Sequence, residues 1–451
     1  MTSLSQTAEL STVYTKNGGY ITWVFSGLGK FWGFMNAGNS VCSNWVDLPT
    51  YPVLYAEYVG GLFHLNFWGK LAIKLTSLVL VVVLNIVGME AVSISSIVLV
   101  AVMLTPFFVQ PFIEAPAVAD WGTASDSMDW AAWTGVMLVR LMLPTRPLHV
   151  CCVSSPSPLF SLQYNYQGWD SLGTIAGEVK NARRSYPLGV GIALVLATVN
   201  YAVPVMAGAG ADAAVWADGG LPQIAQDIAP WLGAWVLVGA SLAVLGEFNA
   251  VMGTSSRALQ KMAEYGLVPS ALGANATRFK TPVPAIVLQA VLCALLMNFS
   301  FAQLVVLDTA FNNMSLVLEV AAFLRLKHLH PGLPRPYAVP GYLRGAWICS
   351  FPKFGVILFS VYTLGFSWQL GVVVGVNALL AVGGAWWAYR YKANEDVLDD
   401  DDPVKMFLQG RPPSNSNVDH EDAGDVEVVP MLDAAFSPLS PAALEAITAE
   451  P

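Results

Sequence analysis

Charged residues are scarce in this chain of 451 residues: Asp, Glu, Lys and Arg make up 12% of it, whereas soluble domains average about 25%. Hydrophobic residues reach 55%, and several long stretches carry no charge. A large soluble core does not need uncharged runs of about 18 residues or more, but each helix that crosses a bilayer does. The scarcity of charge therefore excludes an ordinary soluble protein and predicts a polytopic membrane protein embedded in a lipid bilayer.

Signatures of metal binding and catalysis are also lacking. The five cysteines do not have the spacing of a zinc site, and most of them lie in or near apolar runs. His328 and His330 lie in a basic run that does not suit a metal. The chain has no Walker loop, no G-x-S-x-G and no H-E-x-x-H motif. We therefore expect no enzyme activity, no bound metal or cofactor, and no nucleic acid partner.

Ten apolar runs are present instead, and each is long enough to cross about 30 Å of hydrocarbon as a helix. Only helices satisfy their own backbone hydrogen bonds in such segments. The fold class is therefore all-α, with a transmembrane domain at residues 1–391. The runs lie near residues 33–60, 70–88, 91–113, 130–179 (interrupted), 186–208, 231–255, 282–299, 302–326, 347–364 and 366–389.

The net charge of −9 is unevenly distributed. Residues 392–451 hold 14 acidic and 3 basic residues, so this segment has a net charge of −11 and the transmembrane domain one of +2. The segment is too polar to bury a core, and we expect it to be a disordered acidic tail. Its expected role is that of a solvated tail, although docking to a partner is the alternative.

Lys and Arg alternate between loops in a way that sets the orientation. The stretches 114–129 and 208–230 contain neither residue. The loops at 180–186, 257–281 and 325–346 are basic, and Arg390 and Lys392 follow the last apolar run. The positive-inside rule therefore places these loops and the C-terminus in the cytosol.

The stretch 164–179, YNYQGWDSLGTIAGEV, is the most informative motif. A carboxylate among small and aromatic residues is unfavourable in a bilayer unless it faces a cavity or a partner. The stretch resembles the sixth transmembrane segment of the polyamine transporters in the amino acid–polyamine–organocation superfamily, roughly N-x-N-Y-W-D-S-x-x-T-x-A-G-E-V-x-N. Gln167 and Gly168 depart from that pattern. The matching residues are Asn165, Trp169, Asp170, Ser171, Thr174, Ala176, Gly177, Glu178, Val179 and Asn181.

Other motifs extend the resemblance over most of residues 8–392. TAEL, KNGGY, WGF and NWVDLPTYPVL are similar to the end of the family's second segment and to its third. MAEYGLVP is similar to the loop after the eighth segment, and LEVAAFLRLKHLHPGLPRPYAVP to the tenth segment and its exit. The resemblance implies two inverted repeats of five helices plus two C-terminal helices, with a site at the midplane where the first and sixth helices unwind.

A polyamine is a flexible chain of protonated amines, so its site needs carboxylates for the ammonium groups and aromatic faces for the cation and its methylenes. Asp47 and Tyr51, four residues apart, lie on one face of the third segment. Glu247 departs from the family, which is apolar at that position. The residues that we expect to contact the substrate are Asp47, Tyr51, Asn165, Tyr166, Trp169, Asp170, Ser171, Glu247, Asp308 and Asn312.

Structural explanations exist for several of these residues. Asp170 could be a helix N-cap after Gly168, Asp47 could pair with a neighbouring helix, and Trp169 could be interfacial packing. Glu178 lies near Lys180 at the expected cytosolic end, where a gate or loop ion pair suits it better than substrate contact.

The resemblance implies a secondary transporter that moves putrescine- or spermidine-like cations by alternating access, coupled to protons by symport. We expect it in the plasma membrane, with an endomembrane as the alternative. Cationic or neutral amino acids are the alternative substrates. The alternative of another class is a non-transporting, degraded or mis-spliced relative.

Two departures from the family favour that last alternative. Residues 1–18 resemble the end of a second segment, so we expect the first helix and most of the second to be missing. The insert at 139–163 contains Arg140, Arg146 and four prolines, which cannot continue a membrane helix. Every codon for Val139 begins with GT, and Gln163 can be encoded by CAG, so these residues are compatible with the boundaries of a translated intron. In that case we expect that this polypeptide does not transport. A genuine extracellular loop is the other explanation.

Overall fold

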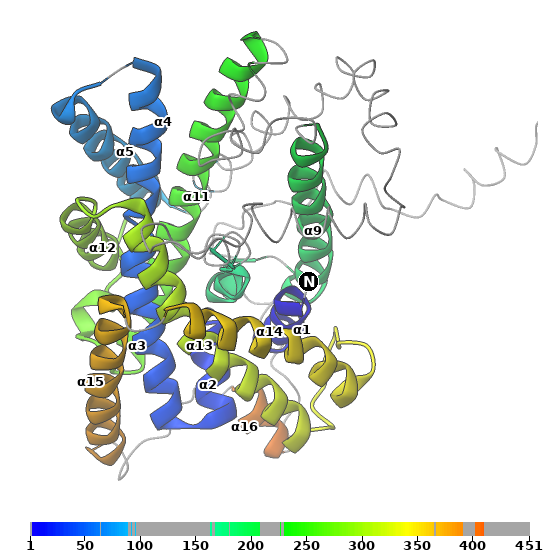
Figure 1. Cartoon of the computed structure of the whole chain (residues 1–451). Coiled ribbons are helices and arrows are strands. Elements are labelled where there is room, and N and C mark those ends of the chain that lie inside the picture. Colours follow the sequence, from blue (N-terminus) through cyan, green and yellow to red (C-terminus); the bar gives the residue numbers. More distant parts are fainter. Residues whose placement is uncertain are drawn as a thin grey trace, which may run out of the picture.

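The computed structural model describes residues 2–63, 65–88, 92, 95, 163–164, 167–179, 181–207, 226, 230–364, 367–390 and 402–409. Within these ranges every regular element is a helix (Figure 1). The α-helices are α1 (Thr2–Val13), α2 (Tyr20–Leu28), α3 (Lys30–Asp47), α4 (Thr50–Phe63), α5 (Phe67–Val87), α9 (Ala182–Ala207), α11 (Pro230–Glu264), α12 (Val283–Leu296), α13 (Phe301–Leu329), α14 (Tyr342–Leu364), α15 (Trp368–Arg390) and α16 (Pro403–Leu408). The 3₁₀-helices are η2 (Trp169–Glu178) and η3 (Ser270–Gly273).

The predicted run at 33–60 is divided into two helices. α3 ends at Asp47, and α4 begins at Thr50, with Pro52 in its first turn. A proline is tolerated there because the first N–H groups of a helix have no partner within it, whereas in a helix interior it would remove a hydrogen bond. The break lies directly beside Asp47 and Tyr51, so it sets the relative direction of these two side chains.

α13 is the central helix of the described part of the chain. It packs along α3 and α2, while α11 packs against α4 and α5, and α15 lies on the other side of α3 (Figure 1). A capping box begins α13: the Ser300 hydroxyl accepts the N–H of Gln303, and the Gln303 side chain accepts the N–H of Ser300. The largest apolar core joins α2 to α11 and α13 through Trp23, Leu259 and Phe323.

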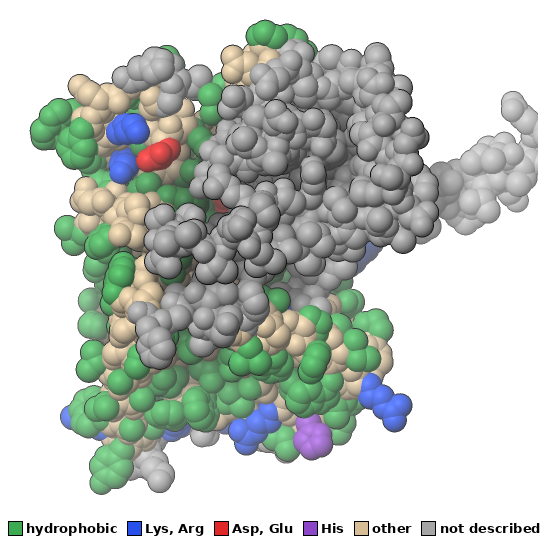
Figure 2. Space-filling model, in the orientation of Figure 1, with side chains coloured by type: hydrophobic (Ala, Val, Ile, Leu, Met, Phe, Trp, Pro, Cys, Tyr) green, Lys and Arg blue, Asp and Glu red, His purple; other side chains and the backbone are tan. Residues whose placement is uncertain are grey.

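Four described helices are long and apolar enough to cross a membrane: α5, α11 from Gly233, α13 and α15. α12 is a shorter apolar helix. Large apolar side chains remain exposed on the outer helices, such as Phe351 on α14 and Leu379 on α15, as expected for surfaces that face lipid. Figure 2 shows many hydrophobic side chains on the described surface, interspersed with other residues, and Lys and Arg at its lower edge and again near its upper left.

Several predictions fall outside the described residues. These include the run at 91–113, nearly all of the insert at 139–163, and Asn165 and Tyr166. Part of the expected disordered tail is ordered. Residues 403–408 form α16, whose cap Asp402 accepts the Ser26 hydroxyl on α2 at 2.6 Å, and Val404 is buried in the main core.

Candidate functional site

Two polar stripes face each other between α3 and α13. Each follows the spacing i, i+4, i+7, i+11, which places all four side chains on one side of a helix. Ser43 donates to Asp308 Oδ1 at 2.5 Å, and the hydroxyl oxygens of Ser40 and Ser315 lie 2.7 Å apart. The two helices therefore run antiparallel along a buried polar seam. The stripes consist of Asn36, Ser40, Ser43 and Asp47 on α3, and of Asp308, Asn312, Ser315 and Glu319 on α13.

A cavity of about 220 Å³ opens at one end of this seam, and four elements each contribute a carboxylate to its lining. Three tyrosines, Tyr20, Tyr51 and Tyr164, also line it. No Lys or Arg is among the described residues that line the cavity. The site is therefore acidic and aromatic. Its four carboxylates are Asp47 on α3, Asp170 on η2, Glu247 on α11 and Asp308 on α13.

Two tyrosines hold the Asp47 carboxylate. Tyr51 donates to Oδ2 at 2.9 Å, and Tyr164 donates to Oδ1 at 2.8 Å. The Tyr164 hydroxyl also lies 2.8 Å from that of Thr50, and the Tyr51 ring stacks on Phe248 with centroids 5.9 Å apart. Because each carboxylate oxygen also has free lone pairs, Asp47 is oriented by neutral donors and can still accept a cationic donor from the cavity.

Asp308 is the most enclosed of the four carboxylates, with 1% of its surface exposed. Ser43 binds Oδ1, and the Gln167 amide N–H₂ donates to Oδ2. Gln167 in turn accepts a hydrogen bond from Asn312 at 3.0 Å. The partners are again neutral, so none of the hydrogen bonds to Asp308 brings a positive charge to this carboxylate.

Asp170 lies in the first turn of η2, whose N-cap is Gly168. Gly168 has φ of 85°, in the left-handed region that glycine tolerates best. Because Gly168 occupies the N-cap position, Asp170 is not the N-cap residue of η2. η2 remains a 3₁₀-helix over 10 residues, which is longer than the usual three or four. This irregular backbone carries Asp170 and Ser171 into the cavity.

The structure brings seven of the ten predicted residues together in this lining: Asp47, Tyr51, Asp170, Ser171, Glu247, Asp308 and Asn312. Trp169 lies elsewhere and packs against Ala8 and Val190. Asn165 and Tyr166 lie outside the described residues. The sequence reasoning did not find Tyr20, Ser43, Tyr164 and Gln167. Two of these residues could have been suspected from their positions in the sequence. Ser43 is one helical turn before Asp47, and Tyr164 begins the most informative motif.

Glu178 forms an ion pair at the far end of η2, as predicted, but with a different partner. Two nitrogens of the Arg257 guanidinium on α11 donate to the two oxygens of Glu178. Asn17 accepts the N–H of Gly177 at 2.8 Å. The end of η2 is therefore held to α11 and to the α1–α2 connection, away from the cavity.

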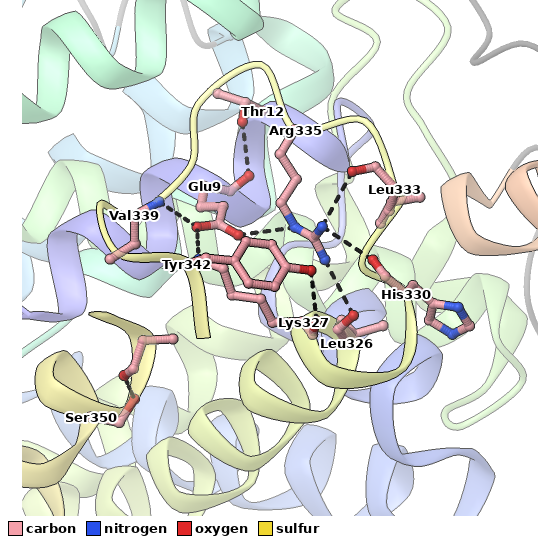
Figure 3. A network of polar contacts seen from close by, with 11 residues as sticks. Glu9, Thr12, Leu326, Lys327, His330, Leu333, Arg335, Val339, Tyr342 and Ser350 are labelled. Carbon is pink, nitrogen blue, oxygen red and sulfur yellow. Dashed lines mark hydrogen bonds and ion pairs between the residues drawn. The ribbon is translucent and has the colours of Figure 1, made fainter. Parts of the chain in front are cut away.

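A second ionic cluster joins two motifs that the sequence analysis could not relate (Figure 3). Glu9 of the TAEL motif accepts from Lys327 Nζ at 2.7 Å and from Arg335 Nε at 3.0 Å. The N–H of Val339 also donates to Glu9, at 2.7 Å. Glu9 and Lys327 are 1% exposed, so α1 is fixed to the end of α13 by a buried ion pair.

Comparisons with known proteins agree with the resemblance drawn from the motifs. A family model described as amino acid permease matches residues 2–388. The chain is 33% identical over 343 residues to the polyamine transporter PUT1 of Oryza sativa subsp. japonica, covering 74% of this chain and 60% of that protein. It is 30% identical over 363 residues to the polyamine transporter RMV1 of Arabidopsis thaliana, covering 78% and 69%. It is also 23% identical over 397 residues to the human (Homo sapiens) cystine/glutamate transporter, covering 83% and 73%.

The family match extends over most of the chain and includes all the elements that line the cavity. It also explains the apolar helices as those of an integral membrane protein, and it places the acidic cavity inside a transporter rather than an enzyme. The motif resemblance is thereby confirmed: the chain belongs to the amino acid permease family of membrane transporters, in the amino acid–polyamine–organocation superfamily.

Proposed function

We propose that this protein is a proton-coupled secondary transporter of polyamines, with putrescine- and spermidine-like cations as its substrates. The observation that supports the proposal is the cavity with four carboxylates, three tyrosines and no Lys or Arg in its described lining. Carboxylates bind ammonium groups through short, charge-assisted hydrogen bonds. The tyrosine rings offer faces to the cations and to the methylenes between them.

The volume of the cavity suits a thin, extended substrate. At about 220 Å³, it is smaller than the roughly 300–1,000 Å³ typical of sites for drug-sized ligands. The carboxylates come from four different elements, so a chain with several separated amines can reach more than one of them. The names of the two plant relatives, both polyamine transporters, point to the same class of substrate.

Amino acids are the competing substrates, since a more distant relative is a cystine/glutamate transporter. An amino acid brings its own carboxylate, which needs a cation or several N–H donors. The described lining supplies no Lys or Arg, so it favours a substrate without an acidic group.

Proton coupling follows from the excess of negative charge. Four lining carboxylates outnumber the two ammonium groups of a diamine and the three of a triamine. Uncompensated charge is unfavourable once a site in the membrane closes over its substrate. Protons are the smallest cations that can balance the remaining negative charge, and we propose that they are transported together with the substrate.

The test is uptake of radiolabelled spermidine by proteoliposomes that contain the full chain, together with a variant that lacks residues 139–163. We expect saturable uptake that spermidine and putrescine inhibit and leucine does not. Asp170→Asn should weaken substrate binding by about 2–5 kcal/mol, because it removes a desolvated charge partner. Inhibition by leucine alone would favour amino acid transport. If neither chain transports any of these solutes, the non-transporting alternative holds.

A further inference from the structure

We propose that Glu319 is the site that binds the coupled proton, and that Ser40 and Ser315 connect it to the cavity. This inference rests on the proton-coupled transport proposed above and names the residue responsible. Glu319 lies on α13, 11 residues after Asp308, and therefore about 16 Å further along the helix. It is 3% exposed and does not line the cavity, so an ammonium group of the substrate does not contact it.

A chain of hydroxyl groups joins Glu319 to the cavity. Ser40 lines the cavity, its hydroxyl lies 2.7 Å from that of Ser315, and Ser315 donates to Glu319 Oε1 at 3.0 Å. A proton that reaches Ser40 Oγ releases the hydroxyl proton of Ser40 to Ser315 Oγ, and Ser315 passes its own proton to Glu319. Each O–H bond that breaks is replaced, so the path carries protons and excludes larger cations.

The hydrogen bonds around Ser315 are complete only when Glu319 is protonated. The Ser315 hydroxyl has a single proton but two acceptors, Glu319 Oε1 and Asn36 Oδ1, the latter at 2.7 Å. A protonated Glu319 donates to Ser315, which leaves the Ser315 proton for Asn36. An ionised Glu319 takes that proton, and Asn36, which is fully buried, loses its donor within the described residues. An unsatisfied buried acceptor is unfavourable by about 1–3 kcal/mol.

The charged groups that face Glu319 come from two other elements. Asp170 on η2 and Lys353 on α14 interact electrostatically with its carboxylate, and so does the hydroxyl group of Tyr20 on α2. Lys353 is 7% exposed, and its ammonium group donates to the Gln6 side chain. It acts on both Asp170 and Glu319, so it links the cavity electrostatically to the proton site.

The count of charges predicts one proton for each triamine. The four lining carboxylates and Glu319 are opposed by Lys353, which leaves four negative charges. A triamine supplies three positive charges, and a proton on Glu319 supplies the fourth. When all five carboxylates are otherwise ionised, the closed, desolvated site is neutral only with both bound, and this requirement couples their movement.

The test uses proteoliposomes with the full chain and the membrane potential clamped at zero. Spermidine–spermidine exchange at equal pH measures binding and alternating access without net proton movement. Accumulation against a gradient of one pH unit, acidic outside, measures coupling, and one proton for each substrate supports about tenfold accumulation. We expect Glu319→Gln to exchange spermidine at the wild-type rate, because the neutral amide stands in for the protonated carboxyl group. We expect it not to accumulate spermidine, so that the inside and outside concentrations stay about equal, because it carries no proton.

The control is Glu264→Gln, since Glu264 is half exposed and paired with Lys261 outside the cavity. It should keep both activities. Tenfold accumulation by Glu319→Gln would overturn the assignment. If that variant does not fold, Ser315→Ala decides the matter: exchange at the wild-type rate with slowed pH-driven uptake supports the path, and wild-type pH-driven uptake overturns it. If neither the wild-type chain nor the variant that lacks residues 139–163 shows exchange, the proposed function is overturned instead.

Discussion

Glu9→Gln should strongly destabilise the protein. Glu9 is 1% exposed and accepts hydrogen bonds from Lys327, Arg335 and the backbone of Val339 (Figure 3). Gln is almost the same size and can still accept a hydrogen bond, so the substitution changes the charge and leaves the packing nearly intact. Lys327 and Arg335, which are 1% and 7% exposed, would then keep their positive charges without a carboxylate.

The magnitude follows from burial. Removing one partner of a buried ion pair costs about 3–5 kcal/mol, because the remaining charge is left uncompensated. Two cations share Glu9 here, so the upper part of that range applies. Lys327→Met in the same chain removes one of the two stranded charges and should recover part of the loss. The interaction energy of such neighbouring residues, obtained from a double-mutant cycle, is typically about 0.5–3 kcal/mol.

The assay is thermal unfolding of the purified, detergent-solubilised protein, followed by tryptophan fluorescence. We expect Glu9→Gln to lower the midpoint by several degrees. Glu264→Gln is the matched control, because the Glu264 side chain, 3.0 Å from Lys261 Nζ, is 50% exposed, whereas that of Glu9 is 1% exposed. Water screens an ion pair with an exposed partner, and its contribution to stability is small. Equal midpoints for the two variants would refute the argument that burial makes the Glu9 cluster important.

Three other predictions concern the cavity, the packing and the orientation. Asp308→Asn should weaken spermidine binding by about 2–5 kcal/mol, and an unchanged KM for uptake would remove Asp308 from the site. Gly19→Ala should lower the thermal midpoint, because Gly19 has φ of 48° and a Cβ there would lie 2.6 Å from the carbonyl carbon of Gly173; a wild-type midpoint would contradict this reasoning. A cysteine at Val215 should react with an impermeant label outside intact cells and a cysteine at Ser270 should not, and the reverse pattern would overturn the orientation.

The sequence predicts the carboxylates of the cavity better than it predicts their partners. Asp47, Asp170 and Asp308 stand out because a carboxylate within an apolar run needs an explanation. Ser43 and Gln167 do not stand out, because serine and glutamine are easily accommodated in membrane helices. Their importance depends on the antiparallel packing of α3 against α13 and on the turn before η2, which arise from contacts distant in sequence.

The same limit applies to the ion pairs and to Trp169. The motifs that contain Glu9 and Lys327 are both visible in the sequence, but these residues are 318 positions apart and nothing local indicates that they meet. The sequence predicts that Glu178 pairs with nearby basic residues, whereas in the structure its ion pair is with Arg257 on another helix. Trp169 directly follows Gly168, whose left-handed backbone conformation changes the direction of the chain. The Trp169 side chain consequently packs against Ala8 and Val190 and does not line the cavity. A pattern of residue types does not reveal such a direction.

α13 connects the three levels at which we expect the transport cycle to be controlled. Asp308 lies in the cavity, Glu319 lies about 16 Å further along the helix, and Lys327 lies about 12 Å beyond that. Gln6 of α1 donates to the backbone oxygen of Glu319, and Glu9 of the same helix binds Lys327. A packed helix transmits a displacement along its length, because interiors are dense and have few voids. Neutralisation of Asp308 and Glu319 would therefore act on the contact between α1 and α13 as well as on the cavity.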